Sequence, residues 1–193
     1  MKQAGFTLAE LMIVIILAGM FSVAIFTFFK SSLFGYLDMQ KTASNFTDLA
    51  AQSQRIAQVV RGSTNITDAQ DYSAEMYAYF YPTDTYVSLI RYYLSTDNTK
   101  LMADVTPMTS NPPVGTQMTA NKKTYTIIGT FKRQTGVKLF EYLSSSGATL
   151  AQPISDLHAV KGVRINLASQ SASPSGDQVM TVDVNLRNKK TNL

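Results

Sequence analysis

The sequence predicts an α+β fold, in which a long N-terminal α-helix packs by its second half on a globular domain built from an antiparallel β-sheet. Two observations predict this architecture. Residues 6–61 keep a helical pattern without interruption, and residues 72–186 repeatedly alternate with the period of two that is typical of strands. One helix followed by many strands favours a helix that covers one face of a sheet.

The first half of the predicted helix is apolar on every side. Residues 6–29 read FTLAELMIVIILAGMFSVAIFTFF and contain one charged residue, Glu10. At about 1.5 Å per residue this segment is roughly 36 Å long, enough to cross a hydrocarbon core of about 30 Å. The hydroxyls of Thr7, Ser22 and Thr27 are expected to bond back to carbonyls of the helix. No comparable run occurs elsewhere, so we expect a single-pass transmembrane segment.

The residues that precede the apolar run are short and carry one charge. Lys2 is expected to stay on the cytoplasmic side of the membrane. An ordinary secretory signal cleaved after Ala24 is the alternative, but the apolar stretch continues beyond that point to Phe29. Such a cleavage would also discard Glu10. A carboxylate this close to the start of a membrane helix costs several kcal/mol unless it finds a partner, which makes Glu10 a candidate functional residue.

Residues 2–16, KQAGFTLAELMIVII, resemble the class III signal peptide and mature start of type IV prepilins and of the pseudopilins of type II secretion. The resemblance implies that a prepilin peptidase cuts after Gly5 and methylates the new N-terminus at Phe6, with Glu10 as an assembly residue. It implies as partners other pilin or pseudopilin subunits, an inner-membrane assembly platform and membrane lipid. Many pilins carry a helix-kinking proline where this chain has Thr27, so the family's usual bend is not expected here.

The chemistry of this junction is consistent with assembly through helices. Cleavage after Gly5 would leave a positive α-amino group on Phe6, and that group could neutralise Glu10 of a neighbouring helix in an apolar bundle. Such a buried pair fixes the register of one helix against its neighbour more effectively than it stabilises the bundle. In the alternative interpretation, Glu10 reaches the membrane interface and needs no partner.

The second half of the helix keeps an apolar stripe. Leu33, Leu37, Phe46, Ile56 and Val60 follow spacings typical of one helix face. A cation and then a glycine, at positions 61 and 62, indicate the end of the helix. We expect the stripe to pack on the sheet; a separate coiled-coil stalk is the alternative, although sustained heptads are missing.

Short segments with strand alternation follow the helix. The predicted strands are residues 72–81, 85–94, 100–105, 124–131, 137–143, 160–167 and 178–186, with residues 154–158 leading into 160–167. Residues 106–121 are predicted to form a long irregular loop, and Asp97-Asn98 a turn. The domains expected are a leader at 1–5, a transmembrane half-helix at 6–29, an amphipathic half at 30–61 and a β-rich pilin domain at 62–193.

Composition argues against several classes of function. The 193 residues include no cysteine, so there is no disulfide framework and no thiolate metal site, although many pilins close their C-terminal region with a disulfide. The net charge of +4 is modest and dispersed, which does not indicate a nucleic-acid partner. His158 is the only histidine and is expected at a strand start. We expect no enzymatic activity and no cofactor.

Two functions remain open at this stage. The first is a structural subunit of a type IV pilus, a competence pilus or a type II secretion pseudopilus, which leaves the inner (cytoplasmic) membrane for a periplasmic or extracellular filament. The alternative is a membrane-tethered binding or adhesion module with an uncleaved signal anchor. Gly5 and Glu10 favour the filament, because a tether needs neither residue. Residues 137–150, 162–168 and 179–188 also resemble the end of larger minor pilins.

Tyrosines are dense in the first half of the strand region, and this density suggests a sugar- or surface-binding face. Tyrosine is also simply common in strands, in which case about half of these side chains should point inward. The residues are Tyr72, Tyr77, Tyr79, Tyr81, Tyr86, Tyr92 and Tyr93.

Overall fold

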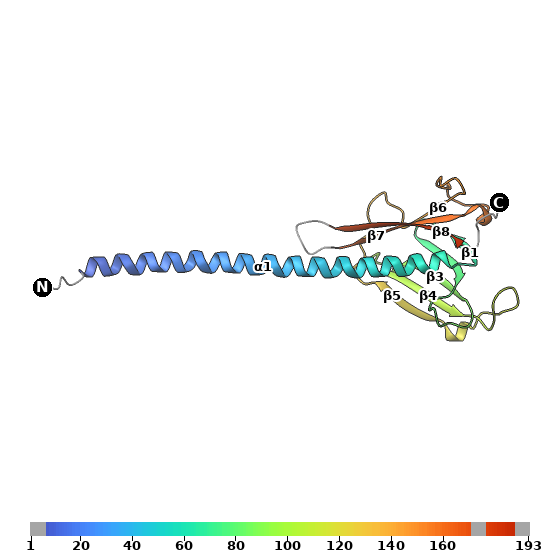
Figure 1. Ribbon diagram of the computed structural model, residues 1–193, viewed down its shortest axis with the longest axis horizontal. Coiled ribbons are helices and arrows are strands. Elements are labelled where there is room, and N and C mark those ends of the chain that lie inside the picture. Colours follow the sequence, from blue (N-terminus) through green and yellow to red (C-terminus); the bar gives the residue numbers. More distant parts are fainter. Residues whose placement is uncertain (1–6, 171–176, 188–193) are drawn as a thin grey trace. The chain divides into compact units, whose positions relative to one another are not determined.

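The structure, a computed structural model, describes residues 7–170 and 177–187. The chain divides into two compact units, Met1–Ala43 and Ser44–Leu193. A single helix, α1 (Leu8–Arg61), supplies the first unit and opens the second (Figure 1). Antiparallel strands make up most of the second unit, which confirms the predicted α+β class. The helix ends where a cation and a glycine predicted it, and Gly62 N–H closes the last turn on the Gln58 carbonyl at 3.1 Å.

Within the first unit, the side chains of α1 are exposed and mostly apolar. The hydroxyls of Ser22 and Thr27 donate to the carbonyls of Ala18 and Val23, each at 2.8 Å, as predicted. These bonds satisfy the two hydroxyls within the helix itself. From Leu11 to Phe29 the helix therefore presents an almost purely apolar surface.

Within the second unit, one face of α1 enters the core. The buried face begins at Leu49 and continues through Ser53, Ile56, Ala57 and Val60 at spacings of three and four. The prediction that the stripe packs on strands is therefore correct for its last turns. It is wrong for Leu33, Leu37 and Phe46, which are all exposed. Periodicity shows that a face is apolar, and it does not show what covers that face.

The larger sheet of the second unit has five antiparallel strands in sequence order, so it is a meander. On β2, β3 and β4, alternate side chains are buried, and Met76, Ile90 and Val105 form one row across the inner face. The strands are β1 (Asn65–Ala69), β2 (Ser73–Ala78), β3 (Ser88–Leu94), β4 (Leu101–Pro107) and β5 (Lys123–Ile128).

Strand β1 was not predicted from the sequence. Its register shifts between Ile66 and Asp68, which is a β-bulge. The bulge inserts one extra residue, so that Ile66 and Ala69 are both buried although they are three positions apart. The period of two is therefore missing from this segment.

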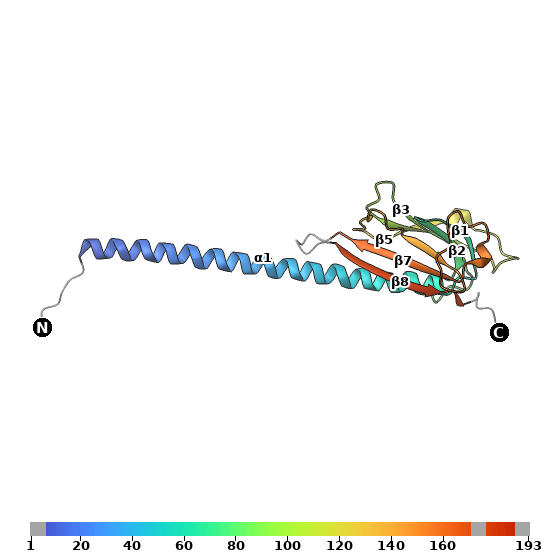
Figure 2. The ribbon, with the colours of Figure 1, turned by 90° about the horizontal axis from the view of Figure 1, so that it is seen from above.

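The second sheet has three antiparallel strands, β6 (Phe140–Leu143), β7 (Gly162–Ser169) and β8 (Gln178–Asn185). The second unit thus contains two sheets where the sequence predicted one. The last turns of α1 lie between the two sheets (Figures 1 and 2). Toward the three-stranded sheet, the Ser53 hydroxyl lies 2.9 Å from the Met180 sulfur of β8. Toward the five-stranded sheet, the Arg55 guanidinium carbon lies 4.7 Å from the ring centroid of Phe80, which follows β2.

The two sheets are joined by a buried hydroxyl and by backbone pairing. The Tyr142 hydroxyl of β6 donates to the Gln70 carbonyl, in the connection between β1 and β2, at 3.2 Å and lies 3.1 Å from the carbonyl of Ser73, the first residue of β2. A bridge between Phe131 and Ser169 links the segment after β5 to the end of β7. Both joints flank the core, so the second unit has one continuous hydrophobic interior.

The connections differ from prediction in two places. Residues 106–121 are less irregular than expected, because β4 continues to Pro107, Met108 pairs with Gln117, and a 3₁₀-helix, η1 (Thr119–Asn121), follows. Residues 154–158 do not form an extended lead-in. They enter a second 3₁₀-helix, η2 (Leu157–Ala159), which contains His158, and so His158 is not at a strand start.

Candidate functional site

The predicted functional residues lie at and before the start of α1. Gly5 and Phe6, the predicted cleavage and methylation positions, fall outside the described residues. Glu10 is described, and it lies in the first turn of the helix. The geometry around Glu10 is therefore the part of this site that the structure provides.

Glu10 forms a reciprocal cap with Thr7. The Thr7 backbone N–H donates to Glu10 Oε2 at 2.8 Å, and the Thr7 hydroxyl donates to the same oxygen at 2.9 Å. In return, the Glu10 N–H donates to Thr7 Oγ1 at 3.3 Å. Thr7 precedes the first helical residue by one position, so Thr7 to Glu10 is a capping box.

The cap corrects one sequence prediction and adds a role. The Thr7 hydroxyl does not bond back to a helix carbonyl as expected, because it lies before the helix and has the Glu10 carboxylate within reach. The carboxylate also lies at the positive end of the helix dipole. Sequence reasoning missed this role, although the signal, a threonine three residues before a glutamate, is present in the chain.

The helix surface beyond Glu10 is apolar and exposed. Leu8 is 79% exposed and Phe28 is 76% exposed, and the large apolar residues between them are similarly uncovered. By length and composition, α1 is able to cross a membrane. Its apolar face requires lipid or other helices as a partner, because exposed apolar patches of this extent are unfavourable in water.

Other residues considered from the sequence do not form a site. His158 is exposed, and its backbone N–H donates to Asp156 at 2.8 Å. No group of three or more histidine, aspartate or glutamate side chains among the described residues could hold a metal ion. Asp97 forms the predicted turn, in which hydrogen bonds from Ser95 and Thr99 lower its pKa to about 2.

The tyrosine-rich segment is mostly accessible. Tyr92 is the only one of the seven tyrosines that is buried, so the expectation that half of them point inward is wrong. Tyr79, Tyr81 and Tyr86 are exposed. The second unit therefore exposes several tyrosine side chains to solvent.

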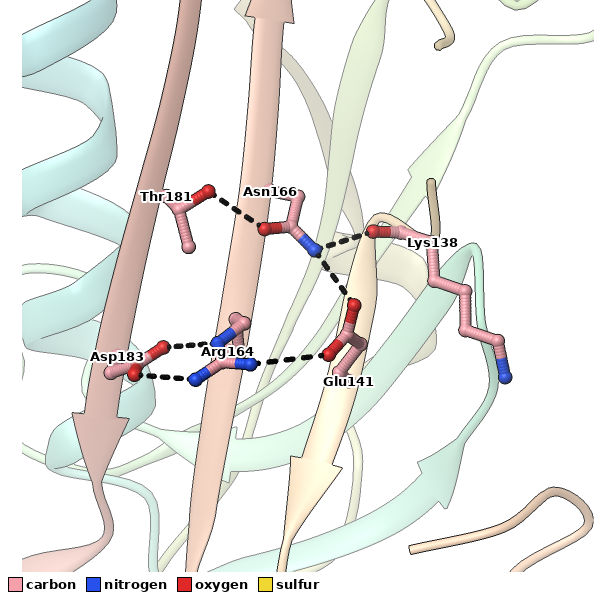
Figure 3. A network of polar contacts seen from close by, with 6 residues as sticks. All are labelled: Lys138, Glu141, Arg164, Asn166, Thr181 and Asp183. Carbon is pink, nitrogen blue, oxygen red and sulfur yellow. Dashed lines mark hydrogen bonds and ion pairs between the residues drawn. The ribbon is translucent and has the colours of Figure 1, made fainter. Parts of the chain in front are cut away.

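The outer face of the three-stranded sheet carries a polar network (Figure 3). Glu141, Arg164 and Asp183 lie directly opposite one another on β6, β7 and β8. Arg164 binds both oxygens of Asp183, at 2.7 and 2.9 Å, and lies 3.6 Å from Glu141. The hydrogen bonds and charge of Arg164 lower the pKa of Asp183.

The next row of the same face is neutral. The Asn166 amide donates to the Lys138 carbonyl at 2.9 Å and to Glu141 at 3.2 Å, and its oxygen accepts from Thr181 at 2.9 Å. These groups satisfy one another, so the network fixes the register of the three strands and leaves no reactive side chain poised for chemistry.

Comparison with known proteins gives one finding for the start of the chain. A family model described as the prokaryotic N-terminal methylation motif matches residues 1–26. The match covers the predicted cleavage position, the Thr7–Glu10 cap and most of the apolar half-helix. No curated protein matches the chain.

Proposed function

We propose, from the premise that the chain is a type IV prepilin-like protein with a class III signal peptide, that it is a structural subunit of a type IV pilus-like filament. In this proposal residues 1–5 are a leader and residues 6–29 anchor the precursor in the inner membrane. The peptidase cleaves after Gly5, and Phe6 becomes the methylated N-terminus. Its role is non-enzymatic, and its partners are other pilin or pseudopilin subunits and the assembly platform.

The observation that carries the proposal is the methylation motif, joined directly to an apolar helix that its own chain leaves uncovered. A helix that only anchors a domain in lipid needs no charge near its start, because a neutral glutamine could serve in the same capping box. Glu10 retains that carboxylate at a cost, which assembly through paired helices explains.

The cap suggests how Glu10 behaves before assembly. In the single chain, Thr7 supplies the hydrogen bonds to the carboxylate, which reduces the cost of placing it beside lipid. On assembly, the α-amino group of Phe6 of a neighbouring subunit adds a charge partner. The pair would then fix the register of one helix against the next.

The first test is the N-terminal residue of the protein isolated from membranes. Mass analysis is expected to find a chain that begins at Phe6 and carries an N-methyl group. An intact start at Met1 would instead support a tethered binding module with an uncleaved anchor. A start at Ile25 would show an ordinary secretory signal, and the filament proposal would be wrong.

The second test separates the charge of Glu10 from its capping role. Glu10→Gln retains an oxygen that can accept from Thr7 but loses the charge, and Glu10→Leu loses both. Both variants are expected to insert into membranes and to be absent from purified filaments. Asp38→Leu, a change of a carboxylate further along the same helix, is the matched control and should assemble. Normal incorporation of Glu10→Gln would show that no charge pair is required.

A further inference from the structure

The second unit contains a cleft that the filament proposal does not use. It has a volume of about 870 Å³, and its walls come from β1, β2 and β3, the connection between β5 and β6, and the connection between β6 and β7. Ligand sites typically have volumes of roughly 300–1,000 Å³. The cleft therefore has the size of a site for a small or oligomeric ligand.

One wall of the cleft is an arginine placed over a tyrosine. The Arg133 guanidinium lies 4.0 Å from the centroid of the Tyr72 ring. Two contacts anchor the connection that carries Arg133, at residues 137 and 138. The Tyr72 hydroxyl donates to the Val137 carbonyl at 3.4 Å, and the Lys138 ammonium pairs with the Asp71 carboxylate at 3.1 Å. The stacking fixes one face of Arg133 and leaves the edge of its guanidinium with donors for a ligand.

A second arginine, Arg91, lines the cleft from β3. The residues directly opposite Arg91 on the neighbouring strands are Glu75 and Asp104, and each of these carboxylates contacts another residue. Glu75 accepts from Thr67 at 2.8 Å, and Asp104 pairs with Lys122 at 2.7 Å. Among the described residues, neither carboxylate forms an ion pair with Arg91, so its guanidinium keeps donors available in the cleft.

In the part of the chain that the structure describes, neither arginine takes part in an ion pair, unlike four other cations of this unit. Lys122, Lys132, Lys138 and Arg164 each pair with a carboxylate. Arg91 and Arg133 are both exposed, so they are accessible to a ligand. Arginine is suited to carboxylates because its planar fork binds both oxygens.

The remaining polar lining is suited to hydroxyl groups. Gln70 and Gln152 contribute amides, and Asp68 contributes a carboxylate. Such groups donate to and accept from sugar hydroxyls. We propose that this cleft binds an acidic oligosaccharide, whose carboxylates pair with Arg91 and Arg133 and whose hydroxyls pair with the amides and Asp68.

The same lining disfavours a nucleic acid. The ring face of Tyr72 that Arg133 covers is not available to a stacked base. A sugar acid presents several hydroxyls beside each carboxylate, and these can pair with the amides and with Asp68, whereas a DNA strand offers few hydroxyl groups.

The test uses the full chain in detergent micelles and three probes. They are a linear trimer of galacturonic acid, the matched neutral trimer of galactose and a short thymidine oligonucleotide. Titration calorimetry is expected to give a dissociation constant below about 1 mM for the acidic trimer, and binding at least tenfold weaker for the neutral trimer. Added salt should weaken the binding of the acidic trimer.

Variants assign this binding to the cleft. Arg91→Gln/Arg133→Gln should lower affinity for the acidic trimer by about tenfold or more, since two charge-assisted contacts are lost. Arg133→Lys keeps the charge but not the fork, and should lower affinity by a smaller factor. Arg187→Gln, a change of an exposed arginine outside the cleft, is the control and should bind like the unmodified chain. Near-ultraviolet circular dichroism verifies that each variant is folded.

Four results would overturn the proposal: no saturable binding of the acidic trimer, equal affinity for the neutral trimer, unchanged affinity in the folded double variant, or tighter binding of the oligonucleotide. If the double variant does not fold, Arg133→Lys supplies the test. Unchanged affinity in that variant would also overturn the proposal. Filament incorporation is not a readout here, so this proposal and the filament proposal fail independently.

Discussion

Tyr142→Phe tests whether the two sheets depend on their shared hydroxyl. Tyr142 is 1% exposed, and its hydroxyl can reach two carbonyls across the junction between the sheets. Phenylalanine keeps the ring, so no cavity forms, but the donor is lost. The Ser73 carbonyl still accepts from the Gln70 N–H at 2.9 Å, whereas the Gln70 carbonyl loses its bond to the hydroxyl. We expect the free energy of unfolding to fall by about 1–2 kcal/mol.

Urea unfolding followed by tyrosine fluorescence measures this change, because every tyrosine except Tyr36 lies in the second unit. A loss of 1–2 kcal/mol should lower Tm by roughly 2–8 °C for a unit of this size. Tyr79→Phe is the control. The Tyr79 hydroxyl makes an exposed contact of 3.4 Å with Asn111, and its removal should change stability by less than about 0.5 kcal/mol. Equal effects of the two substitutions would refute the role of the buried hydroxyl.

Three further predictions concern the whole chain. Burial raises the pKa of Tyr92 and Tyr142 above the ordinary 10.0, so above pH 10 the unfolded chain binds fewer protons than the folded chain. The free energy of unfolding should therefore fall as pH rises, by up to about 1.4 kcal/mol per tyrosine per pH unit. Urea midpoints at pH 9 and pH 11 measure this slope. Tyr92→Phe should reduce the slope. Removal of residues 1–29 should leave a folded, monomeric protein with mixed helix and strand content by circular dichroism. A form that lacks residues 1–43, and with them the exposed Leu33, Phe34 and Leu37, should remain monomeric to higher protein concentrations in sedimentation. Aggregation of both forms would contradict this expectation. Finally, the long connection between β4 and β5, in which Val114 is 83% exposed, favours a low-copy subunit. Quantitative mass spectrometry of filaments that finds this chain dominant would contradict that assignment.

The sequence predicted those parts of the fold in which periodicity is regular. Helix α1 was predicted to its last residue, since Arg61 and Gly62 are strong end signals. Strands β2, β3 and β4 were predicted because one face of each is buried. Alternation identifies the buried face but not the neighbouring strand, so the division into two sheets was not predicted. The link through Tyr142 depends on that division, and nothing in the sequence indicates it.

The candidate site was predicted unevenly for a related reason. Glu10 was identified because a charge within an apolar run is costly wherever it lies. Its bonds to Thr7 were not predicted, because Thr7 was expected to lie within the apolar helix and to donate its hydroxyl to a helix carbonyl. The cleft was not predicted, because Tyr72, Arg91 and Arg133 are far apart in the chain and only the meeting of the two sheets brings them together.

The contact between Ser53 and Met180 spans 127 positions of the chain, and this separation has a consequence for biogenesis. The face of α1 that carries Ile56 and Val60 emerges from the ribosome long before β8 is made. At a translation rate of roughly 5–20 residues per second, that face remains uncovered for about 6–25 s, until β8 has been synthesised. Because these long-range contacts can form only once β8 has been made, the second unit should complete its core slowly. Early capture of the N-terminal helix by the membrane would keep nascent copies apart during that interval and so protect them from aggregation.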